Sequence, residues 1–260
     1  MAIALDAASW NDGAATTQTV GMDITSAGMT LGLLVCTDRA RTINSVSDTG
    51  SHTFGLKATL DDTTQWKSRL YVAENCTAQA GNTLSVTLDA SSTGFLLVAF
   101  RLSGNAAAAF DKIASQFLGS PGTGANGVTS GATATLTTQP QLVVGFALPN
   151  GSPNTSLAVG TGFTSALTGT TAFSGVFRLE YQRVTSTTGI AATFTAGANV
   201  GHSAIVATFI EAGASAAVSD ANHQARNRGV SRGVNRGMRK MIQCASGLFT
   251  PCTPRIFLPA

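Results

Sequence analysis

The segment Asn82–Leu102, NTLSVTLDASSTGFLLVAFRL, constrains the fold more than any other part of the chain. In its first half, Leu84, Val86 and Leu88 alternate with hydroxyl side chains, the period of a strand with one buried face. Its second half, FLLVAF, is a continuous apolar run, too short for a buried helix and typical of a strand buried on both faces. The polar residues Asp89–Gly94 between the halves predict a turn. The segment therefore predicts a β-hairpin inside a layered β protein.

Strand patterns recur on both sides of this segment. Met29–Thr37 is apolar on both faces, and Ser68–Cys76 alternates. Ile43–Leu60 predicts a second hairpin, in which Gly50 supplies a positive φ at the turn. Further strands are expected at Gln141–Leu148, Ser156–Thr164, Val176–Val184, Ile190–Gly197 and His202–Ala212. The count of about ten strands predicts an all-β, jelly-roll-like antiparallel β-sandwich.

One short helix is expected at Gly104–Leu118. Asn105 is a suitable N-cap, four alanines follow it, and Phe110, Ile113 and Phe117 recur at helical spacing. No long linker divides the strands, so residues 1–212 are interpreted as one β-sandwich body and residues 213–260 as an extended C-terminal arm.

Composition narrows the class of protein. Charged residues make up 11% of the 260-residue chain, against about a quarter in an ordinary soluble domain. Small and hydroxylated residues take their place, which indicates a β protein with a neutral surface. The segment 1–13 has neither the basic nor the apolar region of a secretory signal, and no stretch approaches the roughly 18 apolar residues of a membrane span. We therefore expect no association with a membrane.

The charge is unevenly distributed. Residues 1–220 carry nine basic and thirteen acidic side chains, whereas residues 221–260 carry seven basic and no acidic ones. The basic segment is a quasi-repeat, NRGV-SRGV-NRGM-RK, whose interior glycines would each cost a helix about 1 kcal/mol. A basic tail on an acidic body points to a binding partner, on which the arm becomes ordered.

The residues expected to bind that partner are the arm's cations and its apolar end. Because valine and methionine, not aromatic residues, alternate with the arginines, an acidic protein surface fits better than nucleic acid. The predicted contacts are Arg226, Arg228, Arg232, Arg236, Arg239, Lys240, Phe249, Ile256 and Phe257.

No catalytic, metal or cofactor site is predicted. The three histidines, His52, His202 and His223, have no neighbouring ligands at metal-site spacing. Neither a nucleophile elbow nor a phosphate-binding loop occurs. A polysaccharide hydrolase would have to bring Asp61 or Asp62 together with Glu180, which the spacing does not favour.

Two further interpretations concern cysteines and aromatic residues. Cys36 and Cys76 fall within strand patterns and are expected in the core. The sequence does not decide whether Cys244 and Cys252 form a disulfide. Trp66 and Tyr71 are the residues expected to stack on a sugar, should the protein bind glycans.

The strand segments, taken in order, resemble a known family. They are SVSDTGSHTFGLKATL, SRLYVAENC, TAQAGNTLSVTL, QLVVGFAL, GFT and LEYQRVTSTTGIAATFTAG with HSAIVATFIEA. This series, over residues 43–212, resembles a β-sandwich module of phage structural and bacterial surface proteins. That family's pattern runs from SDxxGN through YYAxNVxAGxxTVTVT, DLVVG and GFT to a closing W-x-A-x-x-A-x-F strand. Here His202 stands near the family's tryptophan, and Thr49–His52 replaces its Gly-Asn turn. The resemblance implies a non-enzymatic virion or surface component.

We therefore expect a bacteriophage virion structural protein, foremost a capsid decoration (cement) protein assembled in the host cytoplasm. Its C-terminal arm would bind the major capsid protein or another virion protein, and the body would form a homo-oligomer, with a trimer favoured. The alternative is a head or tail fibre or adhesin component that binds host surface carbohydrate.

Overall fold

The computed structural model describes residues 2–62, 65–119, 127–150, 156–171, 173, 175–198 and 201–216. The chain divides into two compact units, Met1–Ala217 and Val218–Ala260, and every described residue belongs to the first. Its last strand extends to Ala216, four residues past the predicted end of the body at 212. The predicted arm beyond it, and a disulfide between Cys244 and Cys252, lie outside the described residues.

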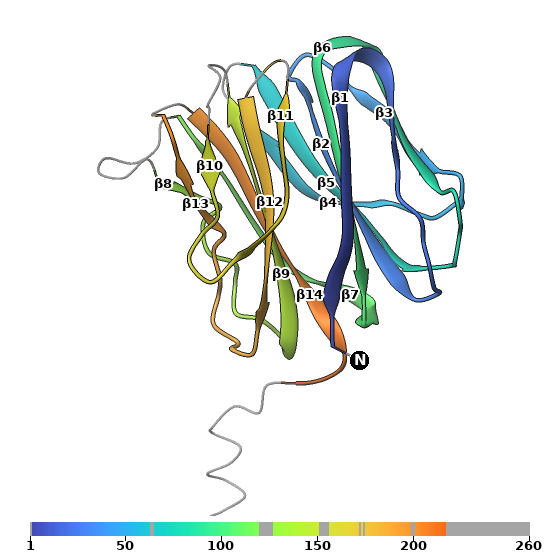
Figure 1. The fold of residues 1–260 in the computed structure, drawn as a ribbon, viewed down its shortest axis with the longest axis vertical. Coiled ribbons are helices and arrows are strands. Elements are labelled where there is room, and N and C mark those ends of the chain that lie inside the picture. The colour runs from blue at the N-terminus through green and yellow to red at the C-terminus, as the bar shows by residue number, and fades with distance from the viewer. Residues whose placement is uncertain are drawn as a thin grey trace, which may run out of the picture. The chain divides into compact units, whose positions relative to one another are not determined.

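The described residues form fourteen strands and three antiparallel sheets (Figure 1). The six-stranded sheet contains, in order, β1 (Ala4–Gly21), β6 (Thr83–Ser103), β2 (Met29–Asp38), β5 (Trp66–Cys76) and β4 (Gly55–Asp61), with β3 (Ile43–Asp48) also paired to β6. The five-stranded sheet runs β11 (Thr164–Thr171), β12 (Gly175–Val184), β9 (Thr138–Asn150), β14 (Gly201–Ala216) and β7 (Asn105–Leu118). A small outer sheet runs β10 (Leu157–Ala158), β13 (Thr193–Ala196) and β8 (Gly127–Thr129). The predicted all-β antiparallel architecture is confirmed.

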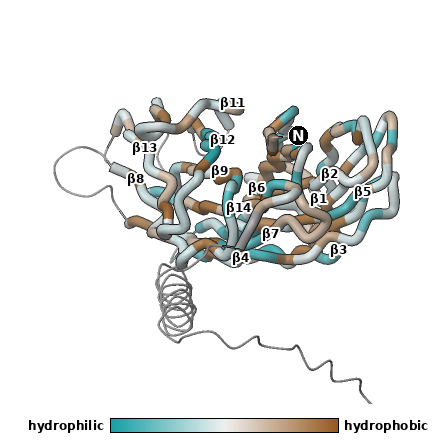
Figure 2. Tube along the Cα trace, turned by 90° about the horizontal axis from the view of Figure 1, so that it is seen from below, coloured by the Kyte–Doolittle hydropathy of each residue, from teal (hydrophilic) through white to brown (hydrophobic). Residues whose placement is uncertain are grey.

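Three apolar cores explain the continuous apolar runs of the sequence. The first lies between the six- and five-stranded sheets. The second lies within the bent six-stranded sheet. On one side of it are β2, β5 and the end of β6, and on the other are β3 and the start of β6. The third lies between the five-stranded sheet and the outer sheet. Both large sheets are thus buried on two faces. Figure 2 shows hydrophobic stretches on strands of both.

The predicted hairpin at Asn82–Leu102 is wrong, because Thr83–Ser103 is the single strand β6. β1 pairs with β6 from Ala4 opposite Ser103 to Gly21 opposite Thr83, with irregular register around Ser92. The two strands turn over together, as Figure 1 shows, so that β6 pairs with β2 at one end and with β3 at the other. The polar residues that suggested a turn lie at this bend. There the Ser92 hydroxyl accepts a hydrogen bond from Thr37 and donates one to the Gly94 carbonyl.

The predicted helix at Gly104–Leu118 is also wrong. This segment is β7, which pairs with β14 along the edge of the five-stranded sheet. The pairing partner lies about a hundred residues away in sequence, so the helix preference of the alanine run is overridden by a non-local contact. The edge is partly protected by side chains. The Phe110 N–H donates to Glu74 Oε1 at 2.8 Å, and Lys57 lies 4.6 Å from the Phe110 ring centroid.

Candidate functional site

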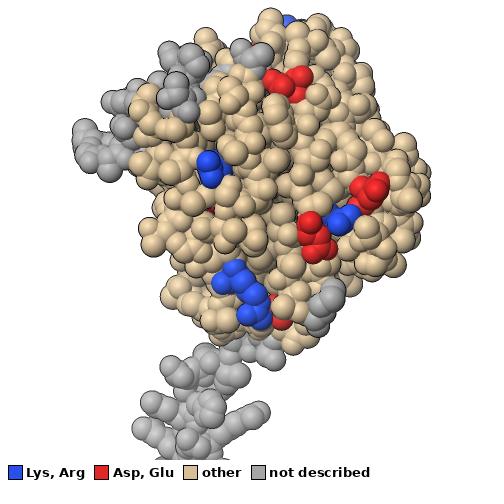
Figure 3. Space-filling model, in the orientation of Figure 1, with Lys and Arg blue, Asp and Glu red and all other residues tan. Residues whose placement is uncertain are grey.

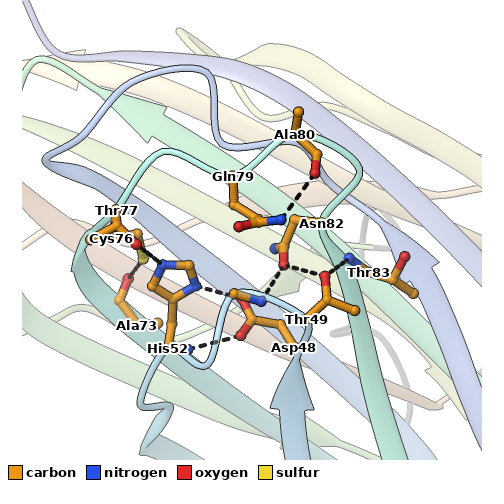
Figure 4. Close-up of polar contacts among 11 residues, drawn as sticks. Asp48, Thr49, His52, Ala73, Cys76, Thr77, Gln79, Ala80, Asn82 and Thr83 are labelled. Atoms are coloured by element: carbon orange, nitrogen blue, oxygen red, sulfur yellow. Dashed lines mark hydrogen bonds and ion pairs between the residues drawn. The ribbon is translucent and has the colours of Figure 1, made fainter.

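A polar network, which we call the Asp48–His52 network, joins three segments at one end of the six-stranded sheet (Figure 4). β3 ends at Asp48 and β4 begins at Gly55, so the intervening loop carries His52 back over Asp48. The other two segments are the end of β5, followed by Thr77, and the start of β6, preceded by Asn82. The two strands of the predicted hairpin, β3 and β4, therefore pair with β6 and β5 and not with each other.

Asp48 and His52 form the buried part of the network. Their side chains are 0% and 9% exposed, and His52 Nδ1 lies 2.6 Å from Asp48 Oδ2. The His52 main-chain N–H donates to the other carboxylate oxygen at 2.9 Å. On the far side of the ring, Nε2 accepts the Thr77 main-chain N–H at 3.1 Å and lies 3.0 Å from the Thr77 hydroxyl. The carboxylate thus orients the imidazole, and the imidazole holds the end of β5.

Asn82 forms the second part of the network. Its Oδ1 accepts hydrogen bonds from the Thr49 hydroxyl and the Gly50 N–H, both at 3.1 Å. The Thr49 hydroxyl in turn accepts the Thr83 N–H at 3.1 Å. Asn82 is 1% exposed. Its side chain therefore satisfies the main chain of the β3–β4 loop in a place that water does not reach.

Three residues near the network adopt a left-handed backbone conformation. Ser51 and Asn75 adopt left-handed conformations, with φ of 58° and 53°, and Gly81 has φ of 64°. The prediction that Gly50 supplies the positive φ is wrong, since the adjacent Ser51 does so. Asn75 fits because asparagine tolerates this conformation better than most residues. The turn after β3 and the NC-TAQAGN stretch of the sequence thus meet in one network.

The network contains a carboxylate, an imidazole and a hydroxyl in a row, the residue types of a nucleophilic triad. A base in such a triad must have a free lone pair to take the hydroxyl proton. Here the Nε2 lone pair already accepts the Thr77 N–H. The arrangement therefore suits a structural clip that fastens the β3–β4 loop to β5 and β6.

Glu180 forms a second buried site, between β12 and the outer layer. It is 0% exposed, and its Oε2 accepts the Gly160 N–H at 2.9 Å. Burial raises the pKa of this carboxyl to about 7, opposed by the main-chain N–H groups of Gly160 and Thr193 and by the Arg178 charge. Sequence patterns did not single out Gly145 or Gly160 as its neighbours, although VVG and the GFT segment near Gly160 belong to the resemblance.

The carboxylates considered for a hydrolase do not converge. Glu180 lies on the face of the five-stranded sheet turned away from the six-stranded sheet. Asp61 pairs with Arg69 on neighbouring strands β4 and β5, and Asp62 accepts the Gln65 N–H at 2.6 Å. Within the described ranges, no three histidine, cysteine or acidic side chains gather as metal ligands do.

Trp66 and Tyr71 do not form a platform for a sugar. Trp66 is 6% exposed, and its ring lies 4.7 Å from that of Phe173. Since the two residues are five positions apart in the regular strand β5, their side chains point to opposite faces. Tyr71 packs against the second core, and burial raises the pKa of its hydroxyl.

The cysteine prediction is confirmed for the described residues. Cys36 and Cys76 are buried and unbridged. Of the histidines, His202 is buried in β14, and His223 lies outside the described residues. So do all nine predicted arm contacts: Arg226, Arg228, Arg232, Arg236, Arg239, Lys240, Phe249, Ile256 and Phe257.

Comparison of the chain with family models, curated proteins and solved structures finds no match. A search of the described residues for a helix that is long and apolar enough to span a membrane also finds none. The class that the structure itself defines is a layered antiparallel all-β protein.

Proposed function

We propose that this chain is a non-enzymatic bacteriophage virion structural protein, foremost a capsid decoration protein. The body would be a jelly-roll-like sandwich displayed on the particle as a homo-oligomer, with a trimer favoured. The arm, residues 213–260, would bind the major capsid protein or another virion protein. The series of strand motifs that resembles phage and surface modules supplies the specific link to virions.

The observation that supports a structural, non-enzymatic role is that the buried polar side chains of the body hold its strands and loops together. Asp48, His52 and Asn82 fasten strands and loops, and Glu180 is enclosed between layers. The outer surface is mostly uncharged on the face shown in Figure 3. A neutral, hydroxyl-rich surface over three apolar cores suits a protein that acts by stable packing against neighbours.

The arm supplies the proposed anchor. Its net positive charge contrasts with the acidic residues 1–220, so an acidic patch on the capsid would attract it. Many copies bound around one particle would add their weak contacts through multivalency.

The experiment uses particles assembled without this protein from the phage that encodes it. Full-length protein is expected to co-sediment with them. The variant in which Arg228, Arg232, Arg236 and Lys240 are all changed to glutamine is expected to remain in the supernatant, as is a chain that ends at Ala217. The matched control changes the body residues Arg39 and Arg41 to glutamine, and it should bind like the parent.

Failure of the full-length protein to co-sediment would overturn the decoration proposal. If such particles form normally but lose attachment to host cells, the fibre or adhesin alternative would replace it. If the chain that ends at Ala217 binds the particles, the body and not the arm makes the contact.

A further inference from the structure

Glu180 is an acidic side chain enclosed between two packed layers. It lies on β12 beside Gly145 of β9, on the face that packs against the outer sheet. Its Oε2 accepts the Gly160 N–H, and the Thr193 main-chain N–H also favours the charged form of the carboxyl. Its Oε1 has no hydrogen-bond partner within the described part of the chain. An ionised carboxylate in this position would leave one charged oxygen both dry and unpaired.

The space around the carboxyl is filled by the outer layer. A Cβ added at Gly145 would lie 2.5 Å from Ala192 Cβ and 3.1 Å from Glu180 Oε1. A Cβ added at Gly160 would lie 2.2 Å from the Thr193 carbonyl oxygen. Glycine at both positions therefore lets the segments 156–163 and 190–196 close directly over the carboxyl.

Few charges face Glu180. Arg178 is two residues away on the same face of β12, and its Nη1 donates to the Ser165 hydroxyl at 3.0 Å. His202 lies on the same face of β14, opposite Pro149 and four residues before Val206, the residue level with Gly145. Segments 156–163 and 190–196, and β9 and β11, contain no ionisable side chain. Among these elements, Arg178 is thus the one charged side chain that favours ionisation of the Glu180 carboxyl.

We propose that Glu180 is a proton-dependent latch that holds the outer layer, segments 156–163 and 190–196, against the five-stranded sheet. With its proton, the carboxyl is neutral and can remain enclosed. Without it, the carboxylate requires water, which reaches it when the outer layer lifts. The layer therefore closes at acidic pH and opens more often as the pH rises through neutrality.

Hydrogen exchange of the full-length protein, followed by mass spectrometry between pH 5 and pH 8, tests this latch. After correction for the intrinsic pH dependence of exchange, opening of both segments should rise on the order of 100-fold, because linkage allows up to tenfold per pH unit. β2, residues 29–38, should remain more protected than both segments at every pH, because it exchanges only when the whole fold opens. Glu180→Gln, which mimics the neutral carboxyl, should abolish the rise in both segments.

The matched control is Glu211→Gln on β14, where the carboxylate pairs with Arg183 outside the enclosure; it should keep the parent's pH dependence. Opening that does not change with pH in the parent, or that still rises in Glu180→Gln, would overturn the proposal. So would protection of both segments no lower than that of β2, since the opening would then be global. A 13C titration of the Glu180 carboxyl gives a second measurement, and a midpoint at the ordinary value for glutamate would also refute the latch. None of these results depends on a virion role.

Discussion

The ring of Phe100 covers Gly32, its partner across β6 and β2, so closely that a Cβ at Gly32 would lie 2.0 Å from Phe100 Cζ. The same ring meets Phe209 of the five-stranded sheet edge to face, with centroids 5.9 Å apart. The missing side chain of Gly32 thus allows Phe100 to join the two large sheets.

Gly32→Ala should reduce the free energy of unfolding by about 1–3 kcal/mol, the usual cost of overpacking a core. Urea unfolding followed by circular dichroism measures the change. Gly21→Ala is the matched control, because a Cβ there meets nothing within 4 Å. Equal stability of the two variants would contradict the close packing at Gly32.

Asn82→Ala should destabilise the protein by about 1–3 kcal/mol, because the Gly50 N–H and the Thr49 hydroxyl lose a buried acceptor. The same unfolding measurement applies. Gln79→Ala is the control, since that half-buried side chain donates only to the neighbouring Ala80 carbonyl. If both variants unfold like the parent, Asn82 does not hold the loop.

Trp66→Ala should cost about 3–5 kcal/mol of stability, as expected for removal of a large buried ring. Its burial can be checked separately by acrylamide quenching in a Trp10→Phe background, where Trp66 is the remaining tryptophan. Weak quenching in the folded protein is expected. Quenching as strong as that of the unfolded chain would return Trp66 to the candidates for glycan binding.

Cys36 and Cys76 should resist alkylation in the folded protein. Burial raises the pKa of their thiols to about 12 and about 11, and the thiolate is the reactive form. Iodoacetamide labelling in a Cys244→Ser, Cys252→Ser background, read by mass spectrometry, should show no modification until urea is added. Rapid labelling without urea would mean that these strands open readily.

Stability should fall as the pH rises from about 5 to about 7. Because burial raises the pKa of Glu180 from 4.5 to about 7, the folded state binds this proton more tightly than the unfolded state. The stabilisation is complete below pH 4.5, declines through that window and is lost above pH 7. The loss amounts to about 3 kcal/mol at 1.36 kcal/mol per unit. In urea unfolding measured across this pH range, Glu180→Gln should abolish the loss of unfolding free energy. If the variant still shows the parent's pH dependence, another group is responsible for it.

The sequence predicts burial better than connectivity. The run FLLVAF correctly indicates a strand buried on both faces, because Phe95 to Phe100 contact two different cores. Whether Asp89–Gly94 ends a strand or bends it depends on β1, about seventy residues earlier, which pairs on both sides of the bend. The alanine-rich β7 is misread for the same reason, since its pairing with β14 leaves no local trace.

In the candidate sites, too, local sequence predicts neighbours within one turn but not contacts between distant segments. Asp48 and His52, four residues apart, could be recognised as neighbours in a turn. Their connection to Thr77 and Asn82 depends on three separate segments meeting. Glu180 is an ordinary polar position in the pattern of β12, and only the approach of Gly160 and Ala192 makes it a buried acid.

The long pairing of β1 with β6 also bears on how the chain is made. During synthesis, residues 4–21 leave the ribosome well before their partners at 83–103, at a rate of about 5–20 residues per second. β1 therefore waits several seconds, exposed and unpaired, for a partner that pairs with both of its halves. A nascent chain of this design has reason to engage a chaperone early, before its second core can form.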